Sequence, residues 1–401
     1  MNENGIIPRL LERQIENHLF RGRTIVLYGA RRVGKTTLAK QILARHPDKR
    51  SRYLNCDLLS VRRALGVEEA ATLKAFIGDQ DLVIMDEAQQ IENIGLVLKI
   101  LVDEYPEMQV LATGSSSFDL VNQAAEPLTG RMYRFELYPL ALQELAGDQG
   151  YSAVEPRLDF LLRYGSYPSI VNLSEQEARV ALDELVSNYL YRDALAFVGV
   201  RKSTVLIKLL ELLARQIGQE VSYQELGQAL GIDRRTVVGY IDLLEQCFVI
   251  FRLGAFSRNL RKEVAKSVKI YFYDLGVRNG LIQNFAPLSV RSDIGALWEN
   301  FCIVERRKLL RYGQQFVNQY FWRTYDQKEI DYIEEVDGQV RGYEFKWSST
   351  AKIKEPADFL QAYPGSTIQR VRPQQLLAVL ALMSNMTTFG QWLRQAARRW
   401  A

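Results

Sequence analysis

Residues 24–38 read TIVLYGARRVGKTTL, and this stretch decides the fold of the N-terminal part. An apolar, β-branched run from Thr24 to Tyr28 leads directly into a segment that contains two glycines. The residues after it repeat their apolar side chains at helical spacing. Strand, glycine loop and helix thus follow one another, with G-x-x-x-x-G-K-T at the junction. This order is the signature of a phosphate-binding loop and predicts an α/β P-loop fold.

The chemistry of phosphate binding explains the residue types in the loop. Glycines at both ends permit backbone conformations in which several N–H groups point at a phosphate. The helix dipole adds to this attraction, Lys35 can reach the β- and γ-phosphates, and the Thr36 hydroxyl can bind Mg²⁺. We therefore expect ATP and Mg²⁺ as ligands. The predicted nucleotide-binding residues are Gly29, Ala30, Arg31, Arg32, Val33, Gly34, Lys35, Thr36 and Thr37.

Composition sets the frame for the rest of the chain. At 401 residues it is too long for one ordinary core, so about two to four domains are expected. The 47% apolar and 24% charged residues are typical of a folded soluble protein, and a net charge of +4 is uninformative by itself. Positive charge gathers late, at Arg258–Lys269 and near the C-terminus, where an acidic polymer can bind, although most such runs are solvated surface.

Several classes of site are excluded by the sequence. The three cysteines and two histidines lie too far apart for a zinc or redox motif, which fits a reducing compartment. No apolar run approaches the length of a membrane span. We therefore expect a cytoplasmic protein without a membrane partner.

A second nucleotide-site motif follows the P-loop. The apolar run Leu82–Met85 ends in Asp86 and Glu87, as expected for a buried strand with carboxylates at the edge where α/β sheets bind ligands. Asp86 is the predicted Mg²⁺ ligand, and Glu87 is the predicted residue that polarises the attacking water.

Two further residues are candidates for catalysis. Val110–Ser115 reads as another buried strand, and if it lies between the two motif strands, Ser115 can sense the γ-phosphate. The alternative for Ser115 is a plain serine-rich turn. Arg131 precedes one more strand and is a candidate arginine finger that reaches a neighbouring subunit's nucleotide, although most arginines are structural.

Five segments together carry a family resemblance: GARRVGKTTL, VIMDEAQQI, LATGSSS, LTGRMYRFELYPL and RYGSYP. In this order they resemble a prokaryotic AAA-type P-loop ATPase family whose members end in a domain first catalogued as being of unknown function. The resemblance covers nearly the whole chain. It implies a nucleotide-binding core, a small helical lid and a C-terminal half unrelated to ATP hydrolysis. For a second arginine sensor in the lid, Arg163 and Arg192 both remain open.

The middle of the chain predicts a winged helix-turn-helix. An apolar-faced helix at Val205–Ile217 precedes two short helices, whose expected N-caps are Ser222 and Asp233, and then a strand. Arg234 and Arg235 lie at the start of the second capped helix, where such folds contact DNA. Winged helices also serve as protein-docking modules, so DNA binding is one of two alternatives.

The last part holds a second chemical pattern. Glu299 on a helix, Asp331 on a strand and Glu344-Phe345-Lys346 on the next strand together look like a PD-(D/E)xK nuclease core. In such a core Glu299, Asp331 and Glu344 are the predicted metal ligands, and Lys346 positions water or stabilises developing charge. The alternative is a solvated strand on which Glu and Lys alternate.

These observations predict an α/β protein with an AAA-like core, a lid, a winged helix and a restriction-endonuclease-like domain. The expected function is an Mg²⁺-dependent ATPase that controls a DNA-directed, nuclease-like C-terminal half. The alternative is a nucleotide-gated switch that binds DNA or protein without cleaving. If Arg131 is an arginine finger that reaches a neighbouring subunit's nucleotide, the protein is expected to be a homo-oligomer, possibly a hexameric ring. The expected domains are residues 1–150, 151–204, 205–257 and 258–385, followed by a basic tail at 386–401.

Overall fold

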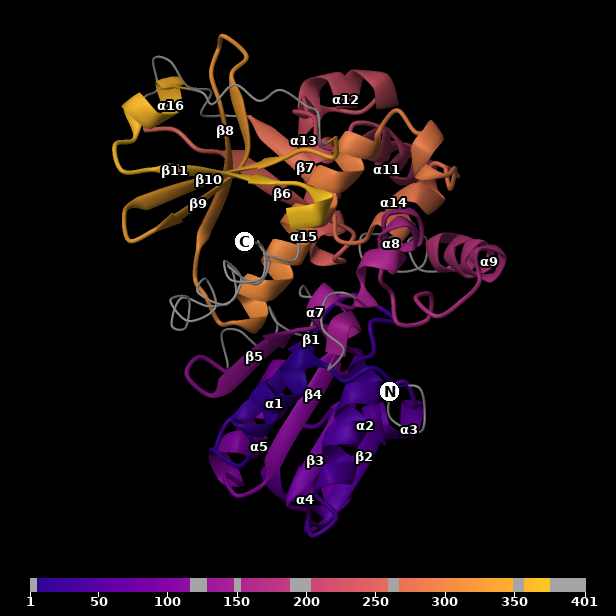
Figure 1. Cartoon of the computed structure of the whole chain (residues 1–401). Helices are drawn as coiled ribbons and strands as arrows, with labels where there is room; N and C mark the ends of the chain where they lie inside the picture. Colours follow the sequence, from indigo (N-terminus) through magenta and orange to yellow (C-terminus); the bar gives the residue numbers. More distant parts are fainter. Residues whose placement is uncertain are drawn as a thin grey trace.

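The computed structural model describes residues 6–115, 128–147, 153–187, 203–258, 267–348 and 357–375. Arg192 and the expected basic tail at 386–401 lie outside these ranges. Figure 1 shows a parallel sheet with its helices at one end of the molecule and a second sheet at the other, with a helical region between them.

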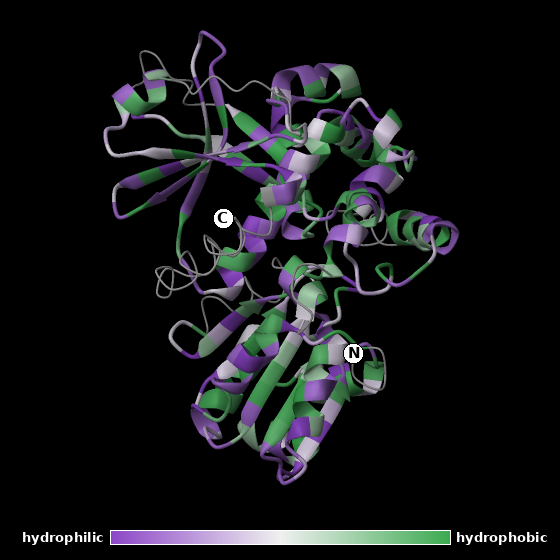
Figure 2. Cartoon of the chain, viewed as in Figure 1, coloured by the Kyte–Doolittle hydropathy of each residue, from purple (hydrophilic) through white to green (hydrophobic). Residues whose placement is uncertain are grey.

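The N-terminal sheet has five strands in the order β2-β3-β4-β1-β5, and all its pairings are parallel. Its three central strands, β3, β4 and β1, are largely apolar and buried, as expected when helices cover both faces, and Figure 2 shows this hydrophobic band. The expected strand β4 does lie between the two motif strands β1 and β3. The bounds are β1 Thr24–Tyr28, β2 Ser51–Asn55, β3 Leu82–Asp86, β4 Gln109–Gly114 and β5 Met132–Glu136.

Helices cover both faces of this sheet. One hydrophobic cluster joins Val26 and Val83 to α3–α5, and the other joins Ile25 and Ile84 to α1 and α2 and continues into the rest of the molecule. The bounds are α1 Leu10–Glu16, α2 Lys35–Arg45, α3 Leu59–Leu65, α4 Ala70–Ile77, α5 Ile94–Glu104 and α7 Leu142–Ala146.

The lid region is built from three helices, one of which comes from much later in the chain. α8 (Leu158–Tyr164) and α9 (Glu175–Leu185) pack against α14 (Leu275–Leu281). The approach of α14 is so close that a Cβ on Gly276 would lie 2.1 Å from the carbonyl oxygen of Tyr164. The helices of the segment expected as a lid, 151–204, thus pack against a helix that lies beyond that segment.

The expected helices of the middle segment are α11 (Ser203–Arg215), α12 (Tyr223–Leu230) and α13 (Arg234–Gln246). Both predicted N-caps are confirmed, because Ser222 accepts a hydrogen bond from the Glu225 N–H and Asp233 accepts one from the Thr236 N–H. Two antiparallel strands follow, β6 (Ile250–Ala255) and β7 (Val268–Phe272).

The second sheet joins the middle and last segments. Its six strands run in the order β11-β10-β9-β8-β6-β7, and β6 pairs with β8 in parallel at Gly254 and Ala255. One sheet thus spans two segments that the sequence suggested as separate domains. The remaining bounds are α15 Ile294–Tyr312, β8 Asn318–Arg323, β9 Glu329–Val336, β10 Gln339–Phe345, α16 Ala357–Ala362 and β11 Thr367–Val371.

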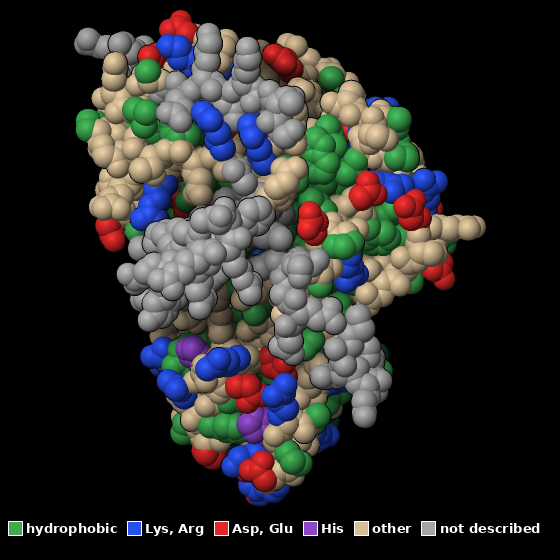
Figure 3. Space-filling view, in the orientation of Figure 1, with side chains coloured by type: hydrophobic (Ala, Val, Ile, Leu, Met, Phe, Trp, Pro, Cys, Tyr) green, Lys and Arg blue, Asp and Glu red, His purple; other side chains and the backbone are tan. Residues whose placement is uncertain are grey.

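The surface carries charges of both signs. On the face shown in Figure 3, Lys and Arg side chains are interspersed with Asp and Glu over the N-terminal sheet and its helices. Much of the positive charge expected late in the chain lies outside the described residues, at 259–266 and 376–401. No described helix is long and apolar enough to cross a bilayer.

Candidate functional site

The P-loop leaves β1 and enters α2 through two glycines with positive φ. Gly34 has φ 100° directly before the first residue of α2, a conformation that residues with a Cβ rarely adopt. Gly29 has φ 148°, and a Cβ there would lie 2.1 Å from the carbonyl oxygen of Leu137. The first glycine is therefore required by the neighbouring backbone as well as by the phosphate.

Lys35 lies buried beneath the loop. Its ammonium group donates to the carbonyl oxygens of Gly29, at 2.9 Å, and Ala30, at 2.8 Å. Its side chain lines a cavity of about 440 Å³, together with residues that include Arg32, Gly34 and Thr36. This volume is within the range of small-molecule sites.

Asp86 is the centre of a hydrogen-bond network that joins the end of β3 to α2, β2 and β4. It accepts from the hydroxyl groups of Thr36, at 2.9 Å, and Thr113, at 2.5 Å. The Tyr53 hydroxyl donates to it as well, at 2.5 Å. All three partners are neutral, so the carboxylate keeps its negative charge uncompensated by the side chains that it contacts here. Thr36 and Asp86, the two residues expected from the sequence to bind Mg²⁺, are therefore in direct hydrogen-bond contact.

Glu87 and Ser115 lie beside this network. Gln89 bridges them, because its amide donates to Glu87 Oε2 at 2.5 Å and to Ser115 Oγ at 3.1 Å. The Glu87 backbone N–H donates to the Thr113 hydroxyl at 3.1 Å and ties the end of β3 to β4. The structure thus brings the predicted water-activating and sensing residues together at the carboxyl edge of the sheet.

The cavity has an apolar side away from the phosphate loop. Ile6, Ile7 and Leu140 line it, together with Pro168 and Asn172 between α8 and α9. The N-terminal segment, the core and the loop between α8 and α9 therefore all contribute residues to one cavity.

Arg131 and Arg163, two of the arginines considered for a catalytic or sensing role, both lie within the described residues. Arg131 precedes β5, and its carbonyl oxygen accepts from the Thr24 N–H at the start of β1. The P-loop begins at the other end of β1, roughly 15 Å away along the strand. Arg131 pairs with Asp103 at 2.6 Å and is not part of its own chain's nucleotide cavity.

Arg163, one of the two candidate lid sensors, has a structural set of partners. Its guanidinium pairs with Asp159 and Glu175, each at 2.8 Å, and donates to the Phe285 carbonyl oxygen. It lines no part of the nucleotide cavity. Arg163 therefore ties α8 to α9 and to the segment after α14.

Arg9 connects the P-loop to the C-terminal half. Its guanidinium donates to the carbonyl oxygens of Val33, at 2.6 Å, and Tyr138, at 2.7 Å, and pairs with Glu144 at 3.0 Å. It also lies 3.5 Å from the hydroxyl group of Tyr312, the last residue of α15. Arg9 is extended and buried, and α1 begins at the next residue, Leu10.

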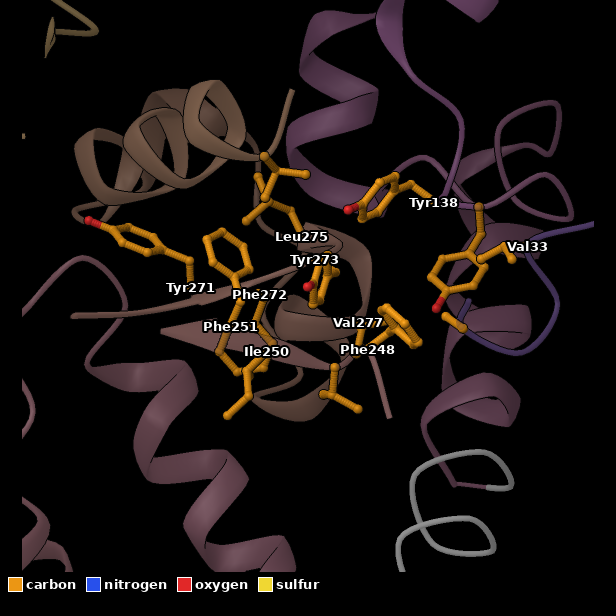
Figure 4. Close-up of a cluster of buried hydrophobic side chains, with 14 of the residues drawn as sticks. Val33, Tyr138, Phe248, Ile250, Phe251, Tyr271, Phe272, Tyr273, Leu275 and Val277 are labelled. Carbon is orange, nitrogen blue, oxygen red and sulfur yellow. The ribbon is translucent and has the colours of Figure 1, made fainter. Parts of the chain in front are cut away.

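Apolar and aromatic contacts continue this junction (Figure 4). The rings of Tyr138 and Tyr273 stack with centroids 5.7 Å apart, and Tyr28 lies 5.9 Å from Phe248. The N-terminal core and the strand pair of the middle segment thus share one hydrophobic cluster.

The second predicted site lies on the six-stranded sheet. Lys346 Nζ is 3.1 Å from Asp331 and 3.0 Å from Glu344, which confirms that the strand alternation places Glu344 and Lys346 on one face. Glu299 on α15 is bound differently. It accepts from Lys269 Nζ at 3.1 Å and from the Tyr271 hydroxyl at 2.5 Å.

Burial and neighbouring charges shift the pKa values of the groups in this second site. Burial, together with the nearby Asp331 charge, raises the pKa of both Glu299 and Glu344. Burial by itself lowers the pKa of Lys269, but the surrounding carboxylates raise it above its usual value, so its ammonium stays charged. Among the described residues, no three His, Cys, Asp or Glu side chains are arranged to hold a metal ion. The predicted metal role of Glu299, Asp331 and Glu344 is therefore not supported by their arrangement.

Comparisons with known proteins place these observations in a family. A family model described as AAA domain matches residues 21–146, and two domains of unknown function, DUF8612 and DUF4143, match residues 155–288 and 294–389. Uncharacterized proteins of Mycobacterium bovis and Mycobacterium tuberculosis are each 32% identical over 345 residues, covering 85% of this chain and 74% of theirs. The chain belongs to the same family as these mycobacterial proteins.

Other similar proteins are more distant. An uncharacterized protein of Methanocaldococcus jannaschii is 27% identical over 314 residues, covering 69% of this chain and 65% of its own. Among solved structures, the Walker-type ATPase of Pyrococcus abyssi has a TM-score of 0.49 and 16% identity, covering 70% of this chain and 97% of that one.

Sequence reasoning did not find four residues that complete these two sites. Tyr53 and Thr113 bind Asp86 in the AAA domain, and both come from strands or strand ends that flank β3. A residue with a hydroxyl group on each neighbouring strand was the available signal. Arg9 and Lys269 had no local motif, since their partners are 24 or more residues away in the sequence.

Proposed function

We propose that the AAA domain binds ATP with Mg²⁺ and hydrolyses it. The observation that supports this most is the group of Thr36, Asp86, Glu87 and Ser115 beside a cavity under Lys35. Thr36 would ligate Mg²⁺ directly and Asp86 would hold it mostly through water, while Lys35 would leave the loop carbonyls for the β- and γ-phosphates. Bound Mg²⁺ would neutralise charge that develops on the phosphates during transfer.

Hydrolysis would depend on Glu87 and its neighbours. The Glu87 carboxylate is proposed to orient and polarise the attacking water, and Ser115 to respond to the γ-phosphate. Gln89 would hold both side chains in place, because it donates a hydrogen bond to each of them.

The proposed site for the base is the apolar side of the cavity. Ile7, Leu140 and Pro168 can contact the faces of a planar ring, and the amide of Asn172 offers both a donor and an acceptor to its edge. Because the lid region contributes part of this surface, base binding would fix the lid against the core.

An oligomer would complete the site. Arg131 lies at the edge of the sheet opposite its own P-loop and remains 43% exposed despite its pair with Asp103. We propose that it acts as a finger on a neighbouring subunit's nucleotide in a homo-oligomer, possibly a hexameric ring. Such fingers stabilise charge in the transition state of phosphoryl transfer.

ATP binding would reach the C-terminal half through α15. This helix of 19 residues spans about 28 Å. Its last residue, Tyr312, contacts Arg9 under the P-loop, and its early turn carries Glu299 on the six-stranded sheet. In between, buried Lys308 donates to the carbonyl oxygen of Leu140 at 2.9 Å. A shift of the P-loop would therefore act on both ends of one rigid element.

The C-terminal half is proposed to bind DNA. α11, α12, α13 and the β6–β7 pair have the order of a winged helix, and Arg234 and Arg235 are exposed at the start of α13. We favour a nucleotide-gated switch that binds DNA or a protein without cutting it. Lysines already pair the carboxylates of the second site, which supports this choice.

DNA cleavage is the second candidate. It is supported by the element order α15, β8, β9, β10, α16, β11. It is also supported by the position of Asp331 and Glu344, which both lie within 3.1 Å of the Lys346 ammonium group. Nicking of plasmid DNA in Mg²⁺, lost in both Glu344→Ala and Lys346→Ala, would favour cleavage over the switch.

The ATPase proposal is tested with Glu87→Gln in the full-length chain. Turnover of ATP, with and without DNA, should fall by about 100-fold or more because the water loses its base. Binding of ATP should persist, since phosphate and metal ligands remain. Glu92→Gln, an exposed carboxyl group a few residues away, is the matched control and should retain full turnover. Absence of any turnover in the wild-type chain, or full activity of Glu87→Gln, would refute the proposal.

A further inference from the structure

Lys269 occupies an unusual position for a lysine. It lies on β7, its side chain is 1% exposed, and its ammonium group sits among the acidic side chains of the second site. It is 3.1 Å from Glu299 on α15 and pairs with Glu329 on β9 as well. Three elements from different parts of the chain therefore converge on one buried cation.

A buried ammonium group is costly unless carboxylates surround it. Removing such an ion from water costs several kcal/mol even after relaxation, and close ion pairs with further hydrogen bonds are needed to offset this. Glu299 and Glu329 supply these pairs, and the Phe321 ring lies 5.4 Å from the ammonium. The position of Lys269 is thus determined by the acidic cluster and is not an incidental surface contact.

A divalent cation in this cluster would compete with the two lysines for the same carboxylate groups. Mg²⁺ and Ca²⁺ bind carboxylate oxygens at roughly 2.0–2.6 Å. Glu299 Oε1 accepts from both Lys269 and the Tyr271 hydroxyl, and Asp331 Oδ2 and Glu344 Oε2 each pair with Lys346. The side chains present therefore do not fit the metal that a nuclease core would carry, which agrees with the absence of a three-ligand group among the described residues.

We propose that the ammonium group of Lys269 is the resident counter-ion of this acidic cluster and closes it to divalent metal ions. The protein's own side chain takes the charge-neutralising place of a metal. Because Lys269 comes from β7, the cluster also fastens the strand pair after α13 to α15 and β9. The inference deepens the proposed non-cleaving role of the C-terminal half and rests on that role, but it does not depend on ATP hydrolysis.

Binding of Mn²⁺, followed by electron paramagnetic resonance in the absence of nucleotide, tests the proposal on the full-length chain. The wild-type protein and Asp331→Asn should give the same titration, because the cluster contributes no metal site. Any Mn²⁺ held near Thr36 and Asp86 is identified by its loss in Asp86→Asn. Lys269→Met should gain a new Mn²⁺ site, at least tenfold tighter than any in the wild type at the cluster. Adding Asp331→Asn to Lys269→Met should remove this site again.

The matched control is Lys328→Met, which removes an exposed lysine that pairs with Asp358 outside the cluster. It should leave the Mn²⁺ titration unchanged. If Lys269→Met does not fold, Lys269→Arg keeps the cation and should exclude Mn²⁺ as the wild type does.

Two results would overturn the proposal. One is a wild-type Mn²⁺ site that Asp331→Asn or Glu344→Gln abolishes. The other is a folded Lys269→Met protein that gains no Mn²⁺ site. Either outcome leaves the proposed ATPase standing, because no nucleotide is present in the titration.

Discussion

Asp86 and Asp331 are both buried carboxylates, 4% and 6% exposed, and each belongs to a strand within a sheet. Their partners differ in charge. Asp86 is held by three neutral hydroxyl groups beside an open cavity of about 440 Å³, whereas Asp331 is bound by the ammonium of Lys346 and by the Phe345 N–H.

This difference shows what decides whether a buried carboxylate is free to bind a cation. Three neutral hydroxyl groups orient Asp86, and none of them competes as a cation with the Mg²⁺ proposed for this site. Lysines neutralise the second cluster in advance, and an incoming metal would have to displace a buried ion pair. Similar residue types therefore serve opposite purposes in the two sites.

The strongest way to break the comparison is to replace each carboxylate by its amide. Asp86→Asn should lower ATP turnover by about 100-fold or more because Mg²⁺ loses its anchor. Asp331→Asn should change turnover by less than about twofold, since its contacts lie on the other sheet. Steady-state phosphate release at saturating Mg²⁺ measures both. A large loss in Asp331→Asn would mean that the second site takes part in the ATPase cycle.

The proposed coupling between the two sites through α15 is tested with Tyr312→Phe. The Tyr312 hydroxyl accepts from the Tyr138 N–H at 3.1 Å, and its loss leaves that buried donor unsatisfied, which costs about 1–3 kcal/mol. We expect ATP binding to change little and the ATP-dependent change in hydrogen exchange of α15 to weaken severalfold. Tyr332→Phe is the control, because the buried Tyr332 hydroxyl has no hydrogen-bond partner in the described part of the chain. Equal behaviour of the two variants would exclude Tyr312 from the coupling.

The smallest expected effect concerns Asp293, at the start of α15. Burial alone raises its pKa, but hydrogen bonds from Arg291 and Arg278 outweigh this and lower the pKa to about 2. A lowered pKa contributes stability above the unfolded-state value, and this stability is lost as pH falls through about 2. Asp293→Asn should therefore reduce the free energy of unfolding by about 1–2 kcal/mol at pH 7 and by much less near pH 2. Urea unfolding at both pH values checks this, and an equal loss at both would contradict the assigned cause.

Much of the fold was predictable because its signals are local. Strands β1, β3, β4 and β5, the caps at Ser222 and Asp233, and the two-residue turn at Asp337 and Gly338 all follow from short stretches of sequence. Both turn residues have positive φ, 49° and 80°, as the Asp-Gly signal predicts. The expected boundary at residue 257 was harder to place, because the pairing of β6 with β8 is a long-range contact.

By itself, the sequence determined the nucleotide-site residues in TIVLYGARRVGKTTL and VIMDEAQQI, since neighbours along the chain stay neighbours in a strand–loop–helix unit. Only the tertiary structure decided which side chains surround them. Tyr53 and Thr113 reach Asp86 because β2 and β4 flank β3, and Lys269 reaches Glu299 because the sheet brings β7 under α15. Sheet order and helix packing set these distances, and a buried charge then selects whichever partner they bring within reach.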